Sequence, residues 1–283
     1  MSIKIQVRSN KGGVAKTTSA VNIGHCLANK GYKVLIVDAD GQANITDYLL
    51  GGVEFIGKRP GINKLLETGS KLNPEDVVVE SRIDNLFVLP NEKIDANGST
   101  YSLTSIIGDH PVFQNIIKNL LKNEFFNDFD YTIFDCGPAN ESDAVSIQVG
   151  CDYLLIPSTP VHDGLTGLKS ALDFLEEINS YMDPCDKTEF LGVIACSINN
   201  TLGEHKDCLK HLKEGLGDYL FQNNIPQSQK AYRFSRTGKT IMDFPKDKAA
   251  IAYELATSEL IQKIEALKKS KTKKNKRAPE ANL

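Results

Sequence analysis

A glycine-containing loop between an expected strand and an expected helix is the feature that most constrains the fold. Ile3–Val7 alternates apolar and polar side chains and is rich in β-branched residues, which predicts a strand. The loop Ser9–Lys16 follows, and Thr17–Lys30 then places apolar residues at helical spacing until Gly31. A strand, a tight loop and a helix in this order form the start of a βαβ unit. We therefore expect an α/β fold with a binding loop near the start of the chain.

The rest of the chain continues this alternation of strands and helices. Val34–Val37 is an unbroken apolar run that ends at Asp38, which is typical of a strand buried on both faces of a parallel sheet. Residues 41–110 are interrupted by glycine and proline and predict short helices with one strand, Leu86–Leu89. Further strands are expected at 131–134, 153–156 and 190–196, and further helices at 112–123, 165–180, 204–216 and 248–267. The pattern predicts a single α/β domain over residues 1–267, with a mostly parallel twisted sheet flanked by helices on both faces.

The charge of the chain is unevenly distributed. The 283 residues carry a formal net charge of −3, yet seven of the ten residues in Lys268–Arg277 are basic and none is acidic. We expect residues 268–283 to form a basic, disordered tail, which either meets a polyanion or only aids solubility. No apolar run approaches the roughly 20 residues of a membrane span, and the N-terminus lacks the pattern of a signal peptide. A cytoplasmic protein without stable membrane insertion is therefore expected.

The loop has the composition of a phosphate-binding site. Its residues are Lys11, Gly12, Gly13, Val14, Ala15, Lys16, Thr17 and Thr18. Glycines let backbone N–H groups converge on a triphosphate, and the positive end of the following helix dipole points at the same place. The lysine before the threonines adds a full charge at the β- and γ-phosphates, and the Thr17 hydroxyl can ligate Mg²⁺. Asn10 and Ala15 replace the two glycines of the usual G-x-x-x-x-G-K-[ST] pattern, but the flanking strand and helix favour nucleotide binding over an ordinary glycine turn.

Three segments of the sequence resemble the ParA/MinD superfamily of P-loop ATPases. Lys11–Thr18, with the pattern Lys-Gly-Gly-x-x-Lys-Thr-Thr, is similar to the deviant Walker A loop of that family, whose signature is the lysine near its start. Val34–Thr46 resembles the next conserved block of the family, and Tyr131–Pro138 resembles its Walker B strand and switch II. The resemblance covers most of residues 1–267. It implies a single P-loop domain, ATP and Mg²⁺ as cofactors, and slow hydrolysis of ATP to ADP and phosphate.

The resemblance assigns roles to the loop and to two acidic residues. It implies that Lys16 contacts the β- and γ-phosphates and that Thr17 ligates the metal. It also implies that Asp40 orients or activates the attacking water and that Asp135 holds Mg²⁺, so that Thr17, Asp40 and Asp135 together form the metal site. Both acids follow apolar strands, where open α/β sheets place their ligands. Asp38 has a lesser expected role, as the residue that ends a strand.

The resemblance further implies a homodimer bridged by ATP. Lys11 would reach across the interface to the ATP of the partner subunit. A cation supplied in trans stabilises the charge that accumulates on the γ-phosphate only after assembly. Asn199 or Asn200 follows the strand expected at 190–196, and in relatives an asparagine near this position reads the adenine. An ordinary turn asparagine is an alternative of nearly equal weight.

The choice among the relatives rests on the C-terminal third of the chain. MinD-like proteins end in an amphipathic membrane helix, whereas the tail of this chain has no apolar face. Gly238–Ile241 resembles the GKPI-like segment of partition ATPases, and basic side chains that contact phosphates bind DNA without reading its sequence. The basic residues expected to contact DNA are Lys230, Arg233, Arg236 and Lys239. The alternatives are a solvated basic face or pairing with acids, such as Lys246 with Asp243.

We therefore interpret the chain as a DNA-partition ATPase, similar to ParA proteins of the Soj kind. ATP closes the homodimer, the dimer binds non-specific DNA on the nucleoid, and a ParB-like centromere-binding partner triggers hydrolysis and release, which moves plasmid or chromosome cargo. Because the first strand begins at Ile3, we expect no N-terminal operator-binding domain and no sequence-specific autoregulation. The alternative is a positioning ATPase of the MinD or McdA kind that acts on a protein or membrane-site cargo.

Overall fold

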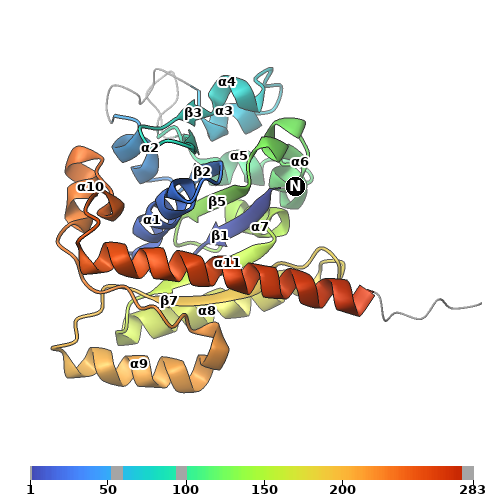
Figure 1. Cartoon of the computed structure of the whole chain (residues 1–283). Helices are drawn as coiled ribbons and strands as arrows, with labels where there is room; N and C mark the ends of the chain where they lie inside the picture. The colour runs from blue at the N-terminus through green and yellow to red at the C-terminus, as the bar shows by residue number, and fades with distance from the viewer. Residues whose placement is uncertain (1, 52–59, 94–100, 276–283) are drawn as a thin grey trace, which may run out of the picture.

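A mostly parallel sheet forms the centre of the structure (Figure 1). The computed structural model describes residues 2–51, 60–93 and 101–275. Within these residues the strands run in the order β3-β4-β2-β5-β1-β6-β7, and β3 alone is antiparallel to its neighbour. The strands are β1 (Ile3–Val7), β2 (Val34–Ala39), β3 (Val79–Glu80), β4 (Leu86–Leu89), β5 (Tyr131–Cys136), β6 (Tyr153–Ser158) and β7 (Glu189–Ala195). The carboxyl ends of β1, β2, β5, β6 and β7 therefore lie at one edge of the sheet.

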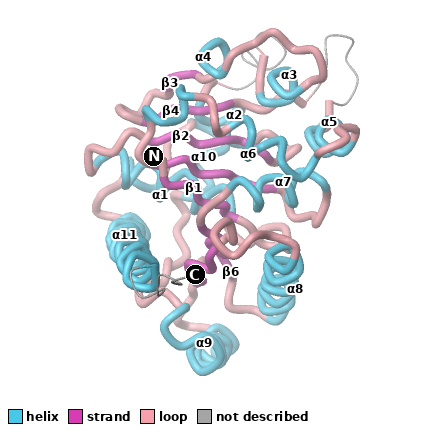
Figure 2. Tube along the Cα trace, turned by 90° about the vertical axis from the view of Figure 1, so that its right-hand side faces the viewer, coloured by secondary structure: helices cyan, strands magenta, loops and turns pink. Residues whose placement is uncertain are grey.

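Helices cover both faces of the sheet (Figure 2). Val34 and Ile36 of β2 pack with α1 (Lys16–Asn29) and α11 (Lys248–Asn275). Leu35 and Val37 point to the opposite face and pack with α7 (Ser142–Gly150). The other helices are α2 (Asn44–Leu49), α3 (Ile62–Leu66), α4 (Pro74–Val77), α5 (Leu103–Gly108), α6 (Ile116–Leu120), α8 (His162–Ser180), α9 (Gly203–Leu216) and α10 (Ala231–Thr237). Because β2 is buried on both faces, its sequence is a continuous apolar run and not an alternating one.

The predicted fold class is confirmed: the described residues form an α/β domain with a mostly parallel sheet between two layers of helices. The strand expected at 34–37 continues to Ala39, so that Asp38 lies inside β2 and not after it. The short helices and the strand expected within 41–110 are also found, as far as this part is described. No helix within the described ranges is both long and apolar enough to cross a membrane.

Two of the predicted helices differ from the structure. The single helix expected at 112–123 is wrong, because this segment forms a 3-10 turn at Phe113–Asn115 and the short α6, which ends at Leu120; a second 3-10 helix follows at Glu124–Asp128. The Asn123 side chain accepts the Phe125 N–H at 3.0 Å and caps that second helix, since asparagine favours caps over helix interiors. The end expected for the last helix is also wrong, because α11 continues from Leu267 to Asn275. Residues 276–283 of the expected disordered tail lie outside the described residues.

Candidate nucleotide-binding site

The loop between β1 and α1 has an open, left-handed backbone. Gly13 has a φ of 76° and Ala15 a φ of 68°. Ala15 is the N-cap of α1, and its carbonyl accepts the Ser19 N–H at 2.8 Å. The first turn of α1 contains no acidic residue, so the positive end of its dipole favours an anion at the loop. An alanine in this region of backbone space costs about 1–2 kcal/mol, and such strain collects at binding sites.

Lys16 is the first residue of α1 and directly follows this loop. It is only 7% exposed, and its Nζ donates a hydrogen bond to the Lys11 carbonyl at 2.9 Å. Burial lowers the pKa of Lys16, while the charges of Asp135 and Asp40 oppose this shift. The ammonium group is therefore near both acidic residues that the sequence singled out. Its bond to a loop carbonyl is one that a phosphate oxygen can replace.

Two carboxylates lie side by side on neighbouring strands. Asp38 of β2 is in register with Asp135 of β5, and both are fully buried. Burial raises the pKa of Asp135 well above its usual value, and the charge of Asp38 raises it further. The Thr17 hydroxyl lies near enough to favour the ionised form, but neither Asp135 oxygen has a hydrogen bond of normal geometry to a described residue. Burying a charge in this way is costly unless a cation compensates it, and Asp135 with Thr17 supplies the hard oxygen ligands that suit Mg²⁺.

Asp38 has a fixed partner, which gives it a larger structural role than the sequence indicated. Its Oδ2 accepts hydrogen bonds from the Thr46 N–H at 2.8 Å and from the Thr46 hydroxyl at 2.7 Å. Burial raises the pKa of Asp38 to about 7, and the two bonds from Thr46 oppose this shift. The Thr46 hydroxyl oxygen in turn accepts the Asn91 N–H at 2.9 Å. Asp38 therefore anchors the first turn of α2, and with it the segment that follows Asp40.

Asp40 lies at the open edge of the site, in the turn that follows β2. It is partly exposed, and its Oδ1 accepts the Gln42 N–H at 2.9 Å. The Asn91 side chain donates to the Asp40 backbone carbonyl at 3.1 Å and so holds this turn in place. The charge of Asp40 acts on both Lys16 and Asp135. The three side chains therefore share one electrostatic environment at the carboxyl edge of the sheet.

The outer part of the loop is braced against α8. Lys11 is exposed on the loop surface. A Cβ atom placed on Gly167 of α8 would lie 2.9 Å from the Lys11 Cβ, so that only glycine allows this approach. The Asn10 side chain donates to the Ser170 Oγ at 2.6 Å. The helix that follows β6 therefore supports the loop on the side that carries Lys11.

Sequence reasoning missed Arg8, which lies directly before the loop. Arg8 is 1% exposed, and its guanidinium carbon lies 3.9 Å from the centre of the Phe174 ring. It donates to the Ala139 carbonyl at 3.3 Å and to the Asn140 side chain. Asn10 also donates to the Asn140 Oδ1, at 2.7 Å. Burial lowers the pKa of Arg8 to about 10, so the side chain stays charged at neutral pH and ties the segment after Asp135 to the loop.

Asn199 lies in the turn that follows β7. Its Oδ1 accepts hydrogen bonds from the Thr201 N–H at 3.0 Å and the Thr201 hydroxyl at 2.7 Å. At the end of the same strand, Cys196 Sγ lies 3.5 Å from the Ser19 Oγ of α1. The turn is therefore close to the helix that carries the phosphate loop. The side-chain oxygen of Asn199 organises this turn, as a turn asparagine does, and Asn200 is exposed.

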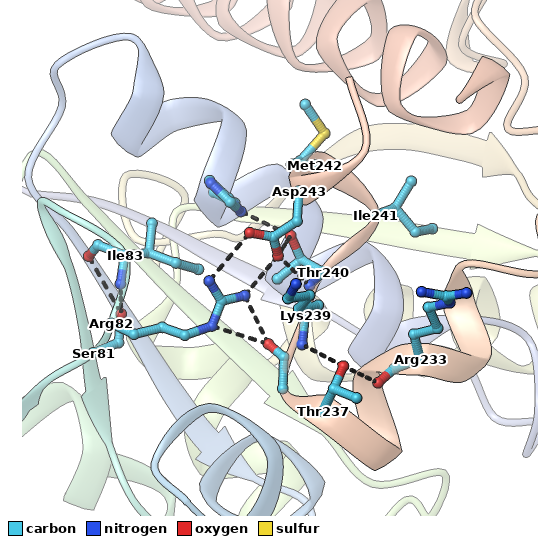
Figure 3. A network of polar contacts seen from close by, with 12 residues as sticks. Ser81, Arg82, Ile83, Arg233, Thr237, Lys239, Thr240, Ile241, Met242 and Asp243 are labelled. Atoms are coloured by element: carbon cyan, nitrogen blue, oxygen red, sulfur yellow. Dashed lines mark hydrogen bonds and ion pairs between the residues drawn. The ribbon is translucent and has the colours of Figure 1, made fainter. Parts of the chain in front are cut away.

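The four basic residues assigned to DNA lie on and around α10. Arg233, Arg236 and Lys239 are exposed, while Lys230 is half-buried with its Nζ 5.0 Å from the centre of the Phe244 ring. Figure 3 shows Arg233 pointing away from the contact between Arg82 and Asp243. The pairing of Lys246 with Asp243, considered from the sequence, is wrong, because the Asp243 carboxylate pairs with Arg82 at 2.6 Å. Pairing with Asp243 therefore does not account for the basic charge of this surface.

The geometry agrees with comparisons to known proteins. The family model for an AAA domain (AAA_31) matches residues 2–185. The sporulation initiation inhibitor protein Soj of Bacillus subtilis is 25% identical over 250 residues, which cover 88% of this chain and 94% of Soj.

Solved structures give the same fold. Apo McdA from Cyanothece matches with a TM-score of 0.77 and 23% identity, over 92% of this chain and 100% of that chain. Cobyrinic acid a,c-diamide synthase from Mycobacterium smegmatis, solved with ADP and magnesium, matches with a TM-score of 0.75 and 22% identity, over 93% and 95% of the two chains. At these identities the likeness shows the fold alone. The family match covers more than half of the chain and spans both the phosphate loop and β5, and the chain therefore belongs to the AAA domain family and to the ParA/MinD superfamily of P-loop ATPases.

Proposed function

We propose that this positioning ATPase is a DNA-partition motor. In this proposal Mg-ATP closes a homodimer, the dimer binds non-specific DNA, and a ParB-like partner stimulates slow hydrolysis that releases it. The observation that carries the nucleotide part is Asp135, a buried carboxylate whose two oxygens lack hydrogen-bond partners among the described residues and which lies near Lys16 and Thr17. The ADP and magnesium in the structure of the M. smegmatis synthase support it, since that chain has the same fold.

Each residue of the site has a role that its position supports. Lys16 exchanges its bond to the Lys11 carbonyl for β- and γ-phosphate oxygens, at the positive end of the α1 dipole. Thr17 and Asp135 would hold Mg²⁺, which neutralises charge that develops on the phosphates. Asp40, on the open edge, accepts a hydrogen bond from the attacking water and orients it.

The dimer part of the proposal depends on Lys11. Its position on the exposed surface of the loop lets it meet a second subunit that packs across the carboxyl edge of the sheet. There its ammonium group would stabilise the γ-phosphate of the partner subunit's ATP during hydrolysis. The interface then forms around ATP and weakens when the γ-phosphate leaves. Asn199 would contact the adenine from the turn after β7.

The DNA part of the proposal is supported by the exposed basic residues of α10 and Lys239. Side chains of this kind bind phosphates of any sequence, which suits a motor that moves over bulk DNA on the nucleoid. The cargo is then a plasmid or chromosome site bound by the ParB-like partner. A protein cargo would require the same ATP cycle but a different partner.

Nucleotide binding is tested first with a Lys16→Ala variant. We expect it to lose ATP binding, because the phosphates lose a buried lysine partner and the loop loses its link to Lys11. A fluorescent ATP analogue titrated into both proteins measures this. Lys33→Ala is the matched control, since this lysine makes a partly exposed ion pair with Asp128 at 4.0 Å. An unchanged affinity in Lys16→Ala would refute the assignment of the loop.

DNA binding is tested by retention on random-sequence duplex across a salt series, with ADP or with a slowly hydrolysed ATP analogue. We expect retention only with the ATP analogue, weakening as salt rises because counterions are released. Arg236→Ala should lower the salt slope by about one ion for each subunit that contacts the DNA. Lys206→Ala on α9 is the control, since it is also exposed but lies outside α10. Retention that is the same with either nucleotide and at every salt concentration would exclude the partition proposal.

A further inference from the structure

Residues 238–243, which follow α10 and end in the 3-10 helix Ile241–Asp243, are here called the 238–243 turn. This turn is held by α1. The Asn22 Oδ1 of α1 accepts the backbone N–H groups of Ile241 at 2.9 Å and Met242 at 3.3 Å. His25, one turn further along α1, has its Nδ1 2.8 Å from the Thr240 Oγ1. The helix that begins with Lys16 and Thr17 therefore contacts the turn next to the basic surface directly.

The same turn is also held by Arg82, which lies between β3 and β4 (Figure 3). Its Nε and Nη2 donate to the Gly238 carbonyl at 3.2 and 2.7 Å. Its Nη1 and Nη2 donate to the two carboxylate oxygens of Asp243 at 3.1 and 2.6 Å. One planar guanidinium thus joins both ends of the 238–243 turn, which a lysine cannot do with the same geometry.

A third contact comes from α2. Gly238 has a φ of 65°, and a Cβ atom on it would lie 2.4 Å from the Tyr48 carbonyl oxygen. The Tyr48 ring also meets the Phe234 ring of α10 edge to face, with centroids 5.1 Å apart. The helix α2 begins four residues after Asp40 and is anchored by Asp38 through Thr46. Its position therefore depends on the segment that faces the γ-phosphate in the proposed function.

These contacts connect the proposed nucleotide site with the basic surface of α10, and nothing in the sequence alone indicates this connection. The surface of α10 carries Arg233 and Arg236, and Lys239 follows it. A helix of seven residues is not stable on its own in water, so the orientation of α10 is set by what it touches. The elements that touch it or its turn include α1, α2 and the Arg82 segment, and α11 also contacts the turn. A movement of α1 or α2 on nucleotide exchange must therefore act on this basic surface.

We propose that Arg82 is a positioning residue that locks the 238–243 turn and α10 onto α1 and α2, so that the basic surface follows the state of the nucleotide. This inference rests on the proposed function. Arg82 itself lies outside the nucleotide site, and its ion pair with Asp243 is partly exposed, with side chains 39% and 22% accessible. Because the pair is partly exposed, its removal leaves no fully buried charge without a partner. Replacing Arg82 should therefore uncouple the two sites and leave the protein folded and able to bind ATP.

The coupling is measured by amide hydrogen exchange in residues 231–243, with ADP and with a slowly hydrolysed ATP analogue. We expect a difference between the two nucleotides in the wild type, its loss in Arg82→Ala, and a partial loss in Arg82→Lys, which keeps the charge without the fork. Lys118→Ala is the control, because it removes an ion pair of similar length, 2.7 Å to Asp186, and Lys118 lies on α6, which packs on the opposite face of the sheet from α10. An undiminished difference in Arg82→Ala, or none in the wild type, would overturn the proposal.

A second measurement separates this inference from the proposed function. Coupling between two sites commonly changes affinity by about 5- to 150-fold. We therefore expect the ratio of DNA affinities with the ATP analogue and with ADP to fall at least about fivefold in Arg82→Ala. In Arg236→Ala both affinities should fall while their ratio stays. A wild type that binds no DNA would refute the partition proposal, and the exchange experiment would still decide the role of Arg82.

Discussion

Several residues at this site have an energetically unfavourable backbone conformation or a buried charged group. Ala15 takes a left-handed backbone, and Asp135 is a fully buried carboxylate whose burial raises its pKa. Arg8 buries a guanidinium under the loop. Strained or desolvated groups persist only where the surrounding structure holds them, and they gather at functional sites. Their concentration around one loop therefore supports the site independently of the sequence pattern.

The strain at Ala15 predicts that Ala15→Gly stabilises the protein without nucleotide. Glycine adopts a φ of 68° without the clash of a Cβ atom, so we expect a gain of about 1 kcal/mol in the free energy of unfolding. Urea denaturation measures the gain. Ala252→Gly in the second turn of α11 is the matched control, since that residue is also partly buried but helical, and it should lose about 1 kcal/mol. Equal losses in both variants would show that Ala15 is not strained.

The residues that could be selected from the sequence are marked by local patterns, whereas those that were missed act through contacts with residues far away in the sequence. Lys16 and Asp40 stand at fixed positions next to a glycine loop and an apolar strand, so local patterns were enough to select them. Arg8 and Asn91 act through contacts with residues more than 40 positions away, Asn140 and Asp40 respectively. No periodicity marks such residues before the fold is known. For Arg8, the one available signal was a charged residue at the end of a buried strand.

At the scale of elements, the helices that matter for coupling are the short ones. The six residues of α2 and seven of α10 cannot hold their shape alone. Each is fixed by side chains from neighbours, α2 by Asp38 and α10 by Arg82 through Gly238. Short elements of this kind were the least predictable, because asparagine caps and long-range bonds, and not apolar spacing, set their ends. The long α1 and the strands other than β3, by contrast, were predicted within a few residues, because α1 has apolar residues at helical spacing and these strands are rich in apolar residues.

The contact between α1 and the 238–243 turn predicts a pH dependence through His25. The Thr240 hydroxyl donates to Asp243 at 3.3 Å, so its oxygen accepts the Nδ1–H of His25. Burial lowers the pKa of His25, Asp243 opposes this shift and Arg82 adds to it. The folded state therefore binds the proton less readily than the unfolded state, whose pKa is about 6.5. Stability is present above that value and is lost as pH falls through the folded pKa.

The test compares the wild type with His25→Asn, which keeps a donor near the Nδ1 position but does not titrate. The free energy of unfolding in urea is measured at several pH values between about 7.5 and 5. We expect the wild type to lose more stability on acidification than the variant, so that the difference between them shrinks. The other histidines are the same in both proteins. Parallel pH profiles would mean that His25 does not sense pH.

At the scale of the whole molecule, the proposed nucleotide site and the basic surface of α10 are formed by different elements. Its carboxyl edge gathers the loop, Asp40 and Asp135, while α10 and its turn carry basic charge beside α1 and α2. The chain has a net charge of −3, so binding to a polyanion has to depend on this local basic surface and not on overall attraction. A surface that small binds DNA better as two copies on one dimer, because the second contact becomes intramolecular. Dimerisation by ATP would therefore control DNA binding even before any change of shape.

This view predicts that Asp40→Ala accumulates as an ATP-bound dimer. Without the carboxylate that orients the water, hydrolysis slows while Lys16 and Asp135 still hold Mg-ATP, so the state that precedes hydrolysis persists. Light scattering after size exclusion with ATP and Mg²⁺ should give twice the monomer mass for the variant and mainly monomer for the wild type. Asp207→Ala, an exposed acid of α9, is the control and should behave as the wild type.

The double variant Lys11→Ala with Asp40→Ala then tests whether the loop lysine acts across the interface. Because the proposed role of Lys11 is in the partner's site, its removal should return the trapped protein to monomer while each subunit still binds ATP. Mixing the two single variants gives the sharper result. In each hybrid dimer one subunit keeps Asp40 and the other keeps Lys11. If Lys11 acts on the ATP of the partner subunit, these two intact residues meet at the same ATP, and one of the two sites is complete. ATP turnover at one of the two sites of the hybrid dimer would support that arrangement. A double variant that remains a dimer despite the loss of Lys11 would rule it out.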